Sequence, residues 1–131
     1  MIPLRIVLAL GIALQAAAGV RAQGAPDVPA GPEVASGPAV MLRGLDKVSG
    51  QINDVEIATG SSGRYGPFEV SVSDCRYPVD DPTSNAYAHL SVRDPAREAP
   101  VFDGWMIASS PALSALDHPR YDLWVLRCKS N

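Results

Sequence analysis

The chain has 131 residues, with 11 lysines and arginines against 14 aspartates and glutamates, which gives a formal net charge of −3 at pH 7. Hydrophobic residues make up 47% of the chain, enough for the core of one small domain. The acidic balance argues against nucleic acid and anionic lipid as partners, because phosphate groups and a negative protein surface repel each other.

The first 22 residues have the pattern of an export signal. Arg5 provides the positive start, residues 6–18 (IVLALGIALQAAA) form an apolar run, and residues 20–22 (VRA) offer small side chains at a cleavage site. The run is shorter than the roughly 20 residues that span a bilayer, although an uncleaved anchor is the alternative. We therefore expect a cleavable signal peptide, no membrane span after cleavage, and a mature periplasmic protein beginning near Gln23.

Residues 23–39 (QGAPDVPAGPEVASGPA) contain four prolines, three glycines and little to bury. This composition predicts a linker or disordered arm. Such an arm either holds the folded part away from a surface or is a tolerated loose terminus. The remaining residues, 40–131, are expected to form a single β domain.

Strand patterns dominate this domain. Residues 86–93 (AYAHLSVR) alternate with period two, and the face expected to be buried carries Ala86, Ala88, Leu90 and Val92. Residues 68–75 (FEVSVSDC) alternate in the same way until Cys75, which falls on the opposite side. This break predicts either a bulge near Asp74 or the end of the strand.

The last two strand signals differ from these. Residues 101–109 (VFDGWMIAS) and 121–128 (YDLWVLRC) are apolar on both faces, so we expect central strands or strands under a covering segment. Weaker strands are expected at residues 40–45 and 54–58, and turn signals separate the strands. About six short antiparallel strands of this kind predict an all-β fold, either a compact sandwich or a barrel.

One short helical turn is expected before the last strand. Ser110 precedes Pro111, and a serine N-cap followed by proline at the first helical position is a strong helix start. His118 precedes Pro119, so the helix must end within a turn or two. In this interpretation the Ser110 hydroxyl accepts a hydrogen bond from an otherwise unpaired backbone N–H.

The same segment contains the residue types of a serine hydrolase. Ser109 or Ser110 would be the nucleophile and His118 the base, with a nearby aspartate to orient it. No G-x-S-x-G elbow accompanies either serine, so we assign no catalytic residue. His118 is expected to bond to its own turn or to lie at the surface, and His89 to be solvated. The histidines lack metal-ligand spacing, so we expect no metal and no cofactor.

Two cysteines, Cys75 and Cys128, are present. In an exported chain an even number favours a disulfide, which would contribute about 4 kcal/mol for a loop of this length. The alternatives are two free thiols or a redox site, and the absence of C-x-x-C spacing disfavours the redox site.

Aromatic residues gather in the last third of the chain. Trp124 shares its parity with Leu126 and Cys128, which favours a place in the core. A glycan-binding module would instead need a row of exposed rings on one face of a sheet. The candidates for that row are Tyr65, Tyr77, Tyr87 and Tyr121.

Three segments together suggest a family. Residues 45–57 (LDKVSGQINDVEI), 65–75 (YGPFEVSVSDC) and 102–128 (FDGWMIASSPALSALDHPRYDLWVLRC) resemble the alphaproteobacterial family called domain of unknown function 2155. The resemblance covers residues 42–128 and implies a small exported protein with cysteines matching Cys75 and Cys128. The family carries no established activity, so no catalytic role transfers. It also implies a gene often placed beside that of an accessory subunit of respiratory complex I.

These observations favour a non-enzymatic periplasmic protein, a binding or accessory module of an inner-membrane or envelope complex, with respiratory complex I as one candidate. The alternatives are a glycan-binding envelope module and a small serine hydrolase. The block around residues 104–119 would be the docking surface. Its candidate interface residues are Trp105, Met106, Ser109, Ser110, Pro111, Leu113, Asp117, His118, Pro119 and Tyr121.

Overall fold

A computed structural model describes Gly19, Gly24 and residues 30–131. The expected signal peptide, residues 1–22, therefore lies outside the described residues apart from Gly19, and so does most of the first half of the arm. Among the described residues, no helix is both long enough and apolar enough to cross a membrane.

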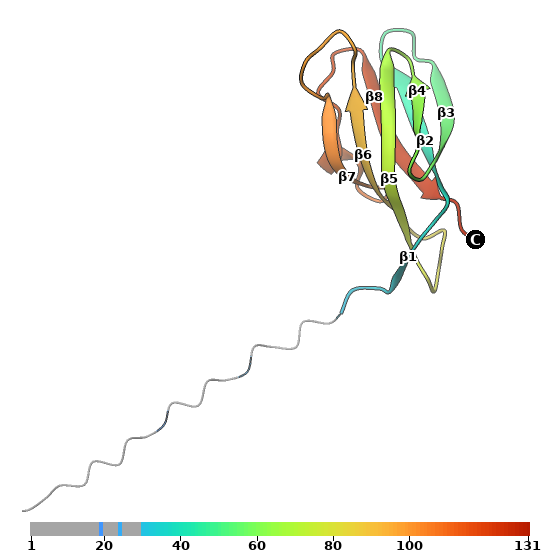
Figure 1. The fold of residues 1–131 in the computed structure, drawn as a ribbon, viewed down its shortest axis with the longest axis vertical. Helices are drawn as coiled ribbons and strands as arrows, with labels where there is room; N and C mark the ends of the chain where they lie inside the picture. Colours follow the sequence, from blue (N-terminus) through green and yellow to red (C-terminus); the bar gives the residue numbers. More distant parts are fainter. Residues whose placement is uncertain (1–18, 20–23, 25–29) are drawn as a thin grey trace, which may run out of the picture.

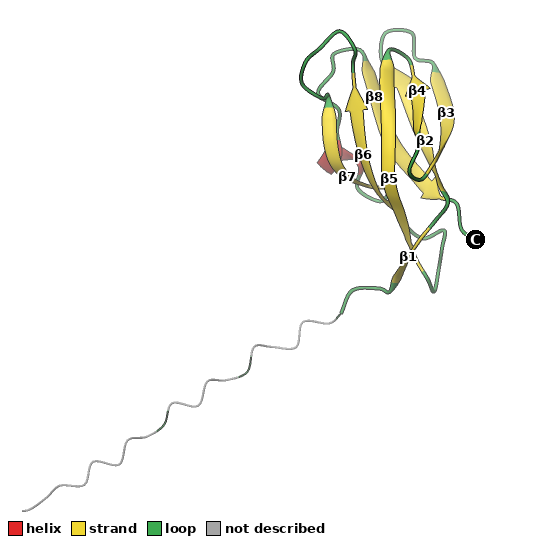
Figure 2. Cartoon of the chain, viewed as in Figure 1, coloured by secondary structure: helices red, strands yellow, loops and turns green. Residues whose placement is uncertain are grey.

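Two antiparallel sheets pack face to face as a sandwich, which confirms the all-β prediction (Figures 1 and 2). The large sheet has the order β1–β5–β6–β7, with β4 also paired to β5, and the small sheet has the order β3–β2–β8. The strands of the large sheet are β1 (Val34–Ser36), β4 (Ser62–Tyr65), β5 (Phe68–Pro78), β6 (Tyr87–Arg93) and β7 (Phe102–Ile107). Those of the small sheet are β2 (Ala39–Asp46), β3 (Ile52–Ala58) and β8 (Tyr121–Cys128).

Two of these eight strands were not expected. Strand β1 lies in the segment that composition predicted as a disordered arm, and it pairs with the far end of β5. The prediction failed there because strand pairing satisfies the backbone even where few side chains are buried. Strand β4 lies in the turn-rich stretch before β5 and forms a tight hairpin with it, in which Gly66 has a φ of 54°.

The core lies between the two sheets. In β6 the predicted alternation is confirmed, because Ala88, Leu90 and Val92 are buried, and Ala86 is buried just before the strand. Of the two alternatives for residues 68–75, the bulge near Asp74 is the one present, because the β5–β6 register shifts between Val72 and Asp74. This extra residue turns Cys75 back toward the core.

The disulfide between Cys75 and Cys128 is confirmed, with a Cα–Cα distance of 5.7 Å. Cys75 belongs to β5 of the large sheet and Cys128 to β8 of the small sheet. The bond therefore crosses the core and joins the two layers of the sandwich.

The expectation of central strands at the end of the chain is wrong. Strands β7 and β8 are both edge strands, one in each sheet. The alternative, a covering segment, is met in part: a short 3₁₀ helix η1 (Pro111–Ser114) connects the two strands (Figure 2) and contacts both. Trp105 on β7 nevertheless stays exposed. The hydroxyl of Ser114 donates to the backbone carbonyl of Trp105 at 2.8 Å, which occupies part of the β7 edge.

Trp124 does not occupy the core as its parity predicted. Leu123 and Val125 point inward, and Trp124 is half-buried on the outer side of β8. A bulge explains the error, because the β2–β8 register jumps from Val125 to Arg127 and leaves Leu126 without a partner. This extra residue brings Cys128 to the buried face and breaks its parity with Trp124.

Candidate binding groove

The serine and histidine side chains proposed as a hydrolase site are not assembled. The Ser109 hydroxyl accepts a hydrogen bond from the Asn85 side-chain amide at 3.0 Å, and its backbone N–H donates to the same amide. The Nδ1 atom of His118 accepts from two backbone N–H groups of its own turn, at 3.1 Å each. Within residues 30–131, no hydrogen bond joins Ser109 or Ser110 to His118. The geometry gives no support to a hydrolase here.

Ser110 also differs from its expected role. Pro111 begins the helix as predicted, but the Ser110 side chain makes no capping hydrogen bond. Its ψ of 60° lies outside the extended region from which N-cap side chains reach the first turn. The Ser110 carbonyl accepts from the Leu113 N–H at 3.1 Å instead, and this backbone bond closes the turn.

A serine–histidine pair does form, but at a different place. The Ser73 hydroxyl lies in a short hydrogen bond with Nδ1 of His89, and it also reaches the His89 carbonyl at 3.1 Å. His89 is half-buried rather than solvated as expected, and its ring tilts against Trp105. Among the described side chains, no carboxylate is hydrogen-bonded to His89. The pair lacks an orienting acid and is a polar contact across the β5–β6 bulge.

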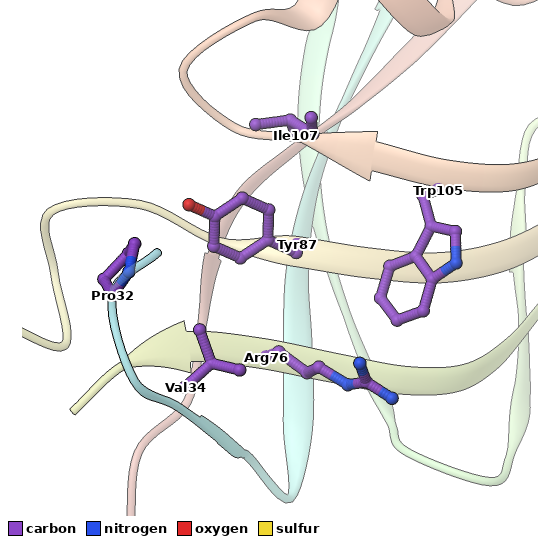
Figure 3. Close-up of a pocket in the computed structure, with 6 residues that line it drawn as sticks. All are labelled: Pro32, Val34, Arg76, Tyr87, Trp105 and Ile107. Carbon is purple, nitrogen blue, oxygen red and sulfur yellow. The ribbon is translucent and has the colours of Figure 1, made fainter. Parts of the chain in front are cut away.

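An apolar groove lies on the outer face of the large sheet. Its floor comes from two neighbouring cross-strand rows that run from β5 through β6 to β7. Arg76, Tyr87 and Ile107 form the first row and all line the groove. The second row is Asp74, His89 and Trp105, of which Trp105 lines the groove. The groove has a volume of about 370 Å³ and is closed at one end by Pro32 and Val34, where the chain enters β1 (Figure 3).

Trp105 is the exposed anchor of this groove. Its side chain is 41% exposed, whereas Met106, the next residue along β7, is 2% exposed and belongs to the core. Figure 3 shows Trp105 and Pro32 at opposite ends of the groove, with Tyr87 between them. Large aromatic side chains with a hydrophobic body and a polar N–H or O–H group are favoured at binding surfaces.

A charged cluster fixes one side of the groove. Nε of Arg76 donates to Asp74 at 2.7 Å, and the hydroxyl of Ser36 donates to the other carboxylate oxygen at 2.9 Å. Partial burial acts to raise the pKa of Asp74, but the hydrogen bonds from Arg76 and Ser36 outweigh it and hold that pKa below its usual range. The guanidinium lies over the Trp105 ring, 4.9 Å from its centre. The groove therefore offers an oriented cation beside aromatic surface.

The candidate interface residues do not form one surface. Trp105 lines the groove, while Pro111 lies with Trp124 in a separate depression beside η1. Tyr121 lines a third, beside Asp46. Met106 is buried and is no interface residue, which corrects the prediction. The others lie in or beside the β7–β8 connection, where Leu113, Asp117 and Pro119 are exposed. Ser109 is hydrogen-bonded to Asn85, the Ser110 carbonyl to the Leu113 N–H, and His118 to the Arg120 N–H.

The groove residues that sequence reasoning missed are Arg76, Ile107, Val34 and Pro32. A signal for part of this set was present, because the β6 alternation directed Tyr87 and His89 outward. Trp105 and Ile107 share the parity opposite to the buried Met106, which also directs them outward. Combining the two alternations would have placed three groove side chains on one face. Nothing in the sequence indicated that β1 would close its end.

The row of tyrosines that a glycan-binding module would need is not formed. Tyr65 and Tyr77 are buried, and Tyr87 and Tyr121 belong to different sheets. The remaining exposed ring, Trp105, already carries the Arg76 guanidinium, which a stacking sugar would have to displace. Among the described residues, no group of three or more histidine, cysteine or acidic side chains is arranged to hold a metal ion.

The molecule is thus a small disulfide-bridged β sandwich with an aromatic, cation-containing groove on one outer face. It belongs to the bacterial family described as "Uncharacterized protein conserved in bacteria (DUF2155)", whose pattern matches residues 40–128. This match confirms the resemblance noted from the sequence.

One relative among curated proteins is the uncharacterized protein RP359 of Rickettsia prowazekii (strain Madrid E). It is 24% identical over 87 residues, which cover 64% of this chain and 56% of the relative. The chain therefore matches little more than half of the length of that protein. No solved structure matches the chain.

Proposed function

We propose that this protein is a non-enzymatic binding module of the periplasm that docks a protein complex of the cell envelope through the Trp105 groove. The single observation that carries the proposal is the exposure of Trp105, since the other large apolar side chains of β6 and β7 are buried or half-buried. An aromatic anchor in a pre-formed groove, with one positioned charge, is a common arrangement at protein-binding surfaces.

The compartment is supported by the covalent structure. Cys75 and Cys128 form a disulfide. Disulfides persist in oxidising compartments and are rare in reducing ones. The sequence pattern of residues 1–22 is an independent argument for export, since it predicts a signal peptide. An inner-membrane complex is the partner we favour, and respiratory complex I is the first to test.

The test is site-specific crosslinking in living cells. A photoreactive amino acid replaces Trp105, and after irradiation the envelope is solubilised gently and the crosslinked proteins are identified by mass spectrometry. We expect subunits of one membrane complex. The matched control carries the same amino acid at Leu113, which is 78% exposed on η1 and lies outside the groove.

A second measurement links docking to function. Trp105→Ala should abolish co-purification of the partner, whereas Leu113→Ala should leave it unchanged. If the partner is complex I, the NADH oxidation rate of membranes from the Trp105→Ala strain should fall as well. Equal crosslinking from both positions, or none from Trp105, would contradict the proposal.

A further inference from the structure

The side-chain groups of the groove that remain free for hydrogen bonding are donors. Arg76 uses its Nε on Asp74, which leaves the N–H groups of its two terminal nitrogens without a partner among the described residues. Trp105 takes part in the described side-chain hydrogen bonds through its carbonyl alone, so its indole N–H is free. The Tyr87 hydroxyl accepts from the Asn85 amide at 3.3 Å, which leaves its own O–H to donate.

No free carboxylate accompanies these donors. Asp74 lies beside the groove, but one of its oxygens accepts from Ser36 and the other from Arg76. The Asp74 side chain is 22% exposed against 47% for Arg76, so the cation is the more accessible charge of the pair. None of the described residues that line the groove is acidic. A complementary ligand therefore brings negatively charged acceptors together with apolar surface.

We propose that the groove binds a segment of the partner protein in which an aspartate or glutamate stands next to an apolar residue. The partner carboxylate accepts from the free N–H groups of Arg76 and Trp105, and the apolar side chain packs between Val34 and Ile107 toward the other end of the groove (Figure 3). A guanidinium can donate two parallel hydrogen bonds to one carboxylate, and such charged bonds are stronger than neutral ones. This inference rests on the docking function proposed above and names the chemistry of the partner.

The groove suits a chain segment better than a small acid. A small-molecule pocket buries about 70–90% of the surface of its ligand. Here Trp105 is 41% exposed and the Arg76 side chain 47% exposed, so a small carboxylate that rests on them stays largely in water. An extended segment across β5, β6 and β7 covers both residues at once and adds apolar contacts at Val34 and Ile107.

The test compares two peptides that differ in one charge, acetyl-Leu-Glu-Leu-amide and acetyl-Leu-Gln-Leu-amide. The chain holds two tryptophans, so the two indole N–H signals of the isotope-labelled protein report on binding by nuclear magnetic resonance. The glutamate peptide should move the Trp105 signal, with half-saturation at about a five- to tenfold lower concentration than the glutamine peptide. The Trp124 signal should stay in place, because Trp124 lines a different depression.

The variant Arg76→Gln should remove the difference between the two peptides. Its Trp124 signal shows whether the fold is retained, and the comparison of the two peptides on the natural protein needs no variant. Arg93→Gln is the matched control, because Arg93 is an exposed cation of the neighbouring strand β6 that does not line the groove. This control should keep the preference for the glutamate peptide.

Equal half-saturation by the two peptides, or no response to either at millimolar concentration, would overturn the proposal. A stronger response of the Trp105 signal to phosphatidylglycerol vesicles than to the glutamate peptide would also overturn it, because a lipid phosphate would then be the acceptor. A complex crosslinked to Trp105 in cells, without a preference between the peptides, would remove this inference alone. A preference between the peptides without a crosslinked partner would instead remove the proposed docking function.

Discussion

Arg120 and Asp46 form a two-pronged ion pair that fastens the loop before β8 to the end of β2. Nε and Nη2 of Arg120 lie 3.1 and 2.8 Å from the two carboxylate oxygens. Asp46 also accepts from the backbone N–H groups of Val48 and Ser49, which shape the β2–β3 turn. Lys47 completes the attachment through its N–H to the Arg120 carbonyl and its Nζ to the His118 carbonyl.

This ion pair predicts a loss of stability in acid. The hydrogen bond from Arg120 is the largest influence on Asp46 and, with the turn N–H groups, holds its pKa well below the ordinary carboxyl value despite partial burial. Because the folded pKa is the lower one, the stabilisation is complete above the unfolded carboxyl pKa of about 4 and is lost as the pH falls below it. Urea midpoints measured across the acid range should therefore fall steeply for the natural protein. For Asp46→Asn they should be lower at neutral pH and decline less.

Asp54→Asn is the matched control, since Asp54 pairs with Arg43 in an exposed two-pronged ion pair. Exposed pairs contribute little, so its midpoint at neutral pH should change less than that of Asp46→Asn. An equal loss in the two variants would show that Asp46 has no special place in the turn.

His118 should be a stability residue and not a catalytic one. Its ring packs edge-on against Phe68, with ring centres 5.0 Å apart, while its Nδ1 accepts the N–H groups of Arg120 and Tyr121. His118→Ala removes the acceptor of both and should lower the free energy of unfolding by about 2 kcal/mol. Denaturant unfolding measures this, and Asp117→Ala, an exposed neighbour, should change it by less than about 0.5 kcal/mol. A neutral His118→Ala variant would contradict the structural role.

Reduction of the Cys75–Cys128 bond should destabilise the sandwich. The bond closes a loop with a sequence separation of 53 residues, and in the chain-entropy model such a loop contributes about 4 kcal/mol. The Cys75→Ser/Cys128→Ser double variant should therefore unfold at much lower denaturant, and the natural protein should match it after reduction. Alkylation before reduction should label no thiol, and two labelled thiols in the untreated protein would contradict the bridge.

Gly44→Ala should be poorly tolerated although it adds a single methyl group. Gly44 lies in β2, and the Tyr65 ring covers it so closely that a Cβ atom there would overlap the ring. Overpacking of this kind costs about 1–3 kcal/mol. Thermal unfolding should show the loss, and Gly50→Ala in the open β2–β3 turn is an informative comparison. No atom lies near a Cβ at Gly50, so only its φ of 76° resists the change.

The sequence predicted the β class, the strand alternation and the disulfide, and it offered the β5 bulge as one of two alternatives, because each depends on local periodicity or on residue count. It did not predict β1 or β4, since short strands gain their stability from a neighbour that the local pattern does not contain. The second bulge, at Leu126, could not be predicted, because residues 121–128 are apolar on both faces and the pattern does not show which face is buried. The groove depends on sheet order, which joined β5, β6 and β7, and no local pattern specifies that order.

The pairing of β2 with β8 also has a kinetic side. Val40 in β2 pairs with Cys128 at the end of the last strand. The small sheet therefore depends on contacts between residues that are far apart in the sequence. Two-state proteins dominated by such contacts fold in about milliseconds to seconds. The reason is that a long loop must close, with a loss of chain entropy, before the stabilising strand contacts form. A chain that emerges N-terminus first during synthesis therefore keeps an open, half-built sandwich until β8 is available. During that interval the exposed edge of β2 needs protection from other strands.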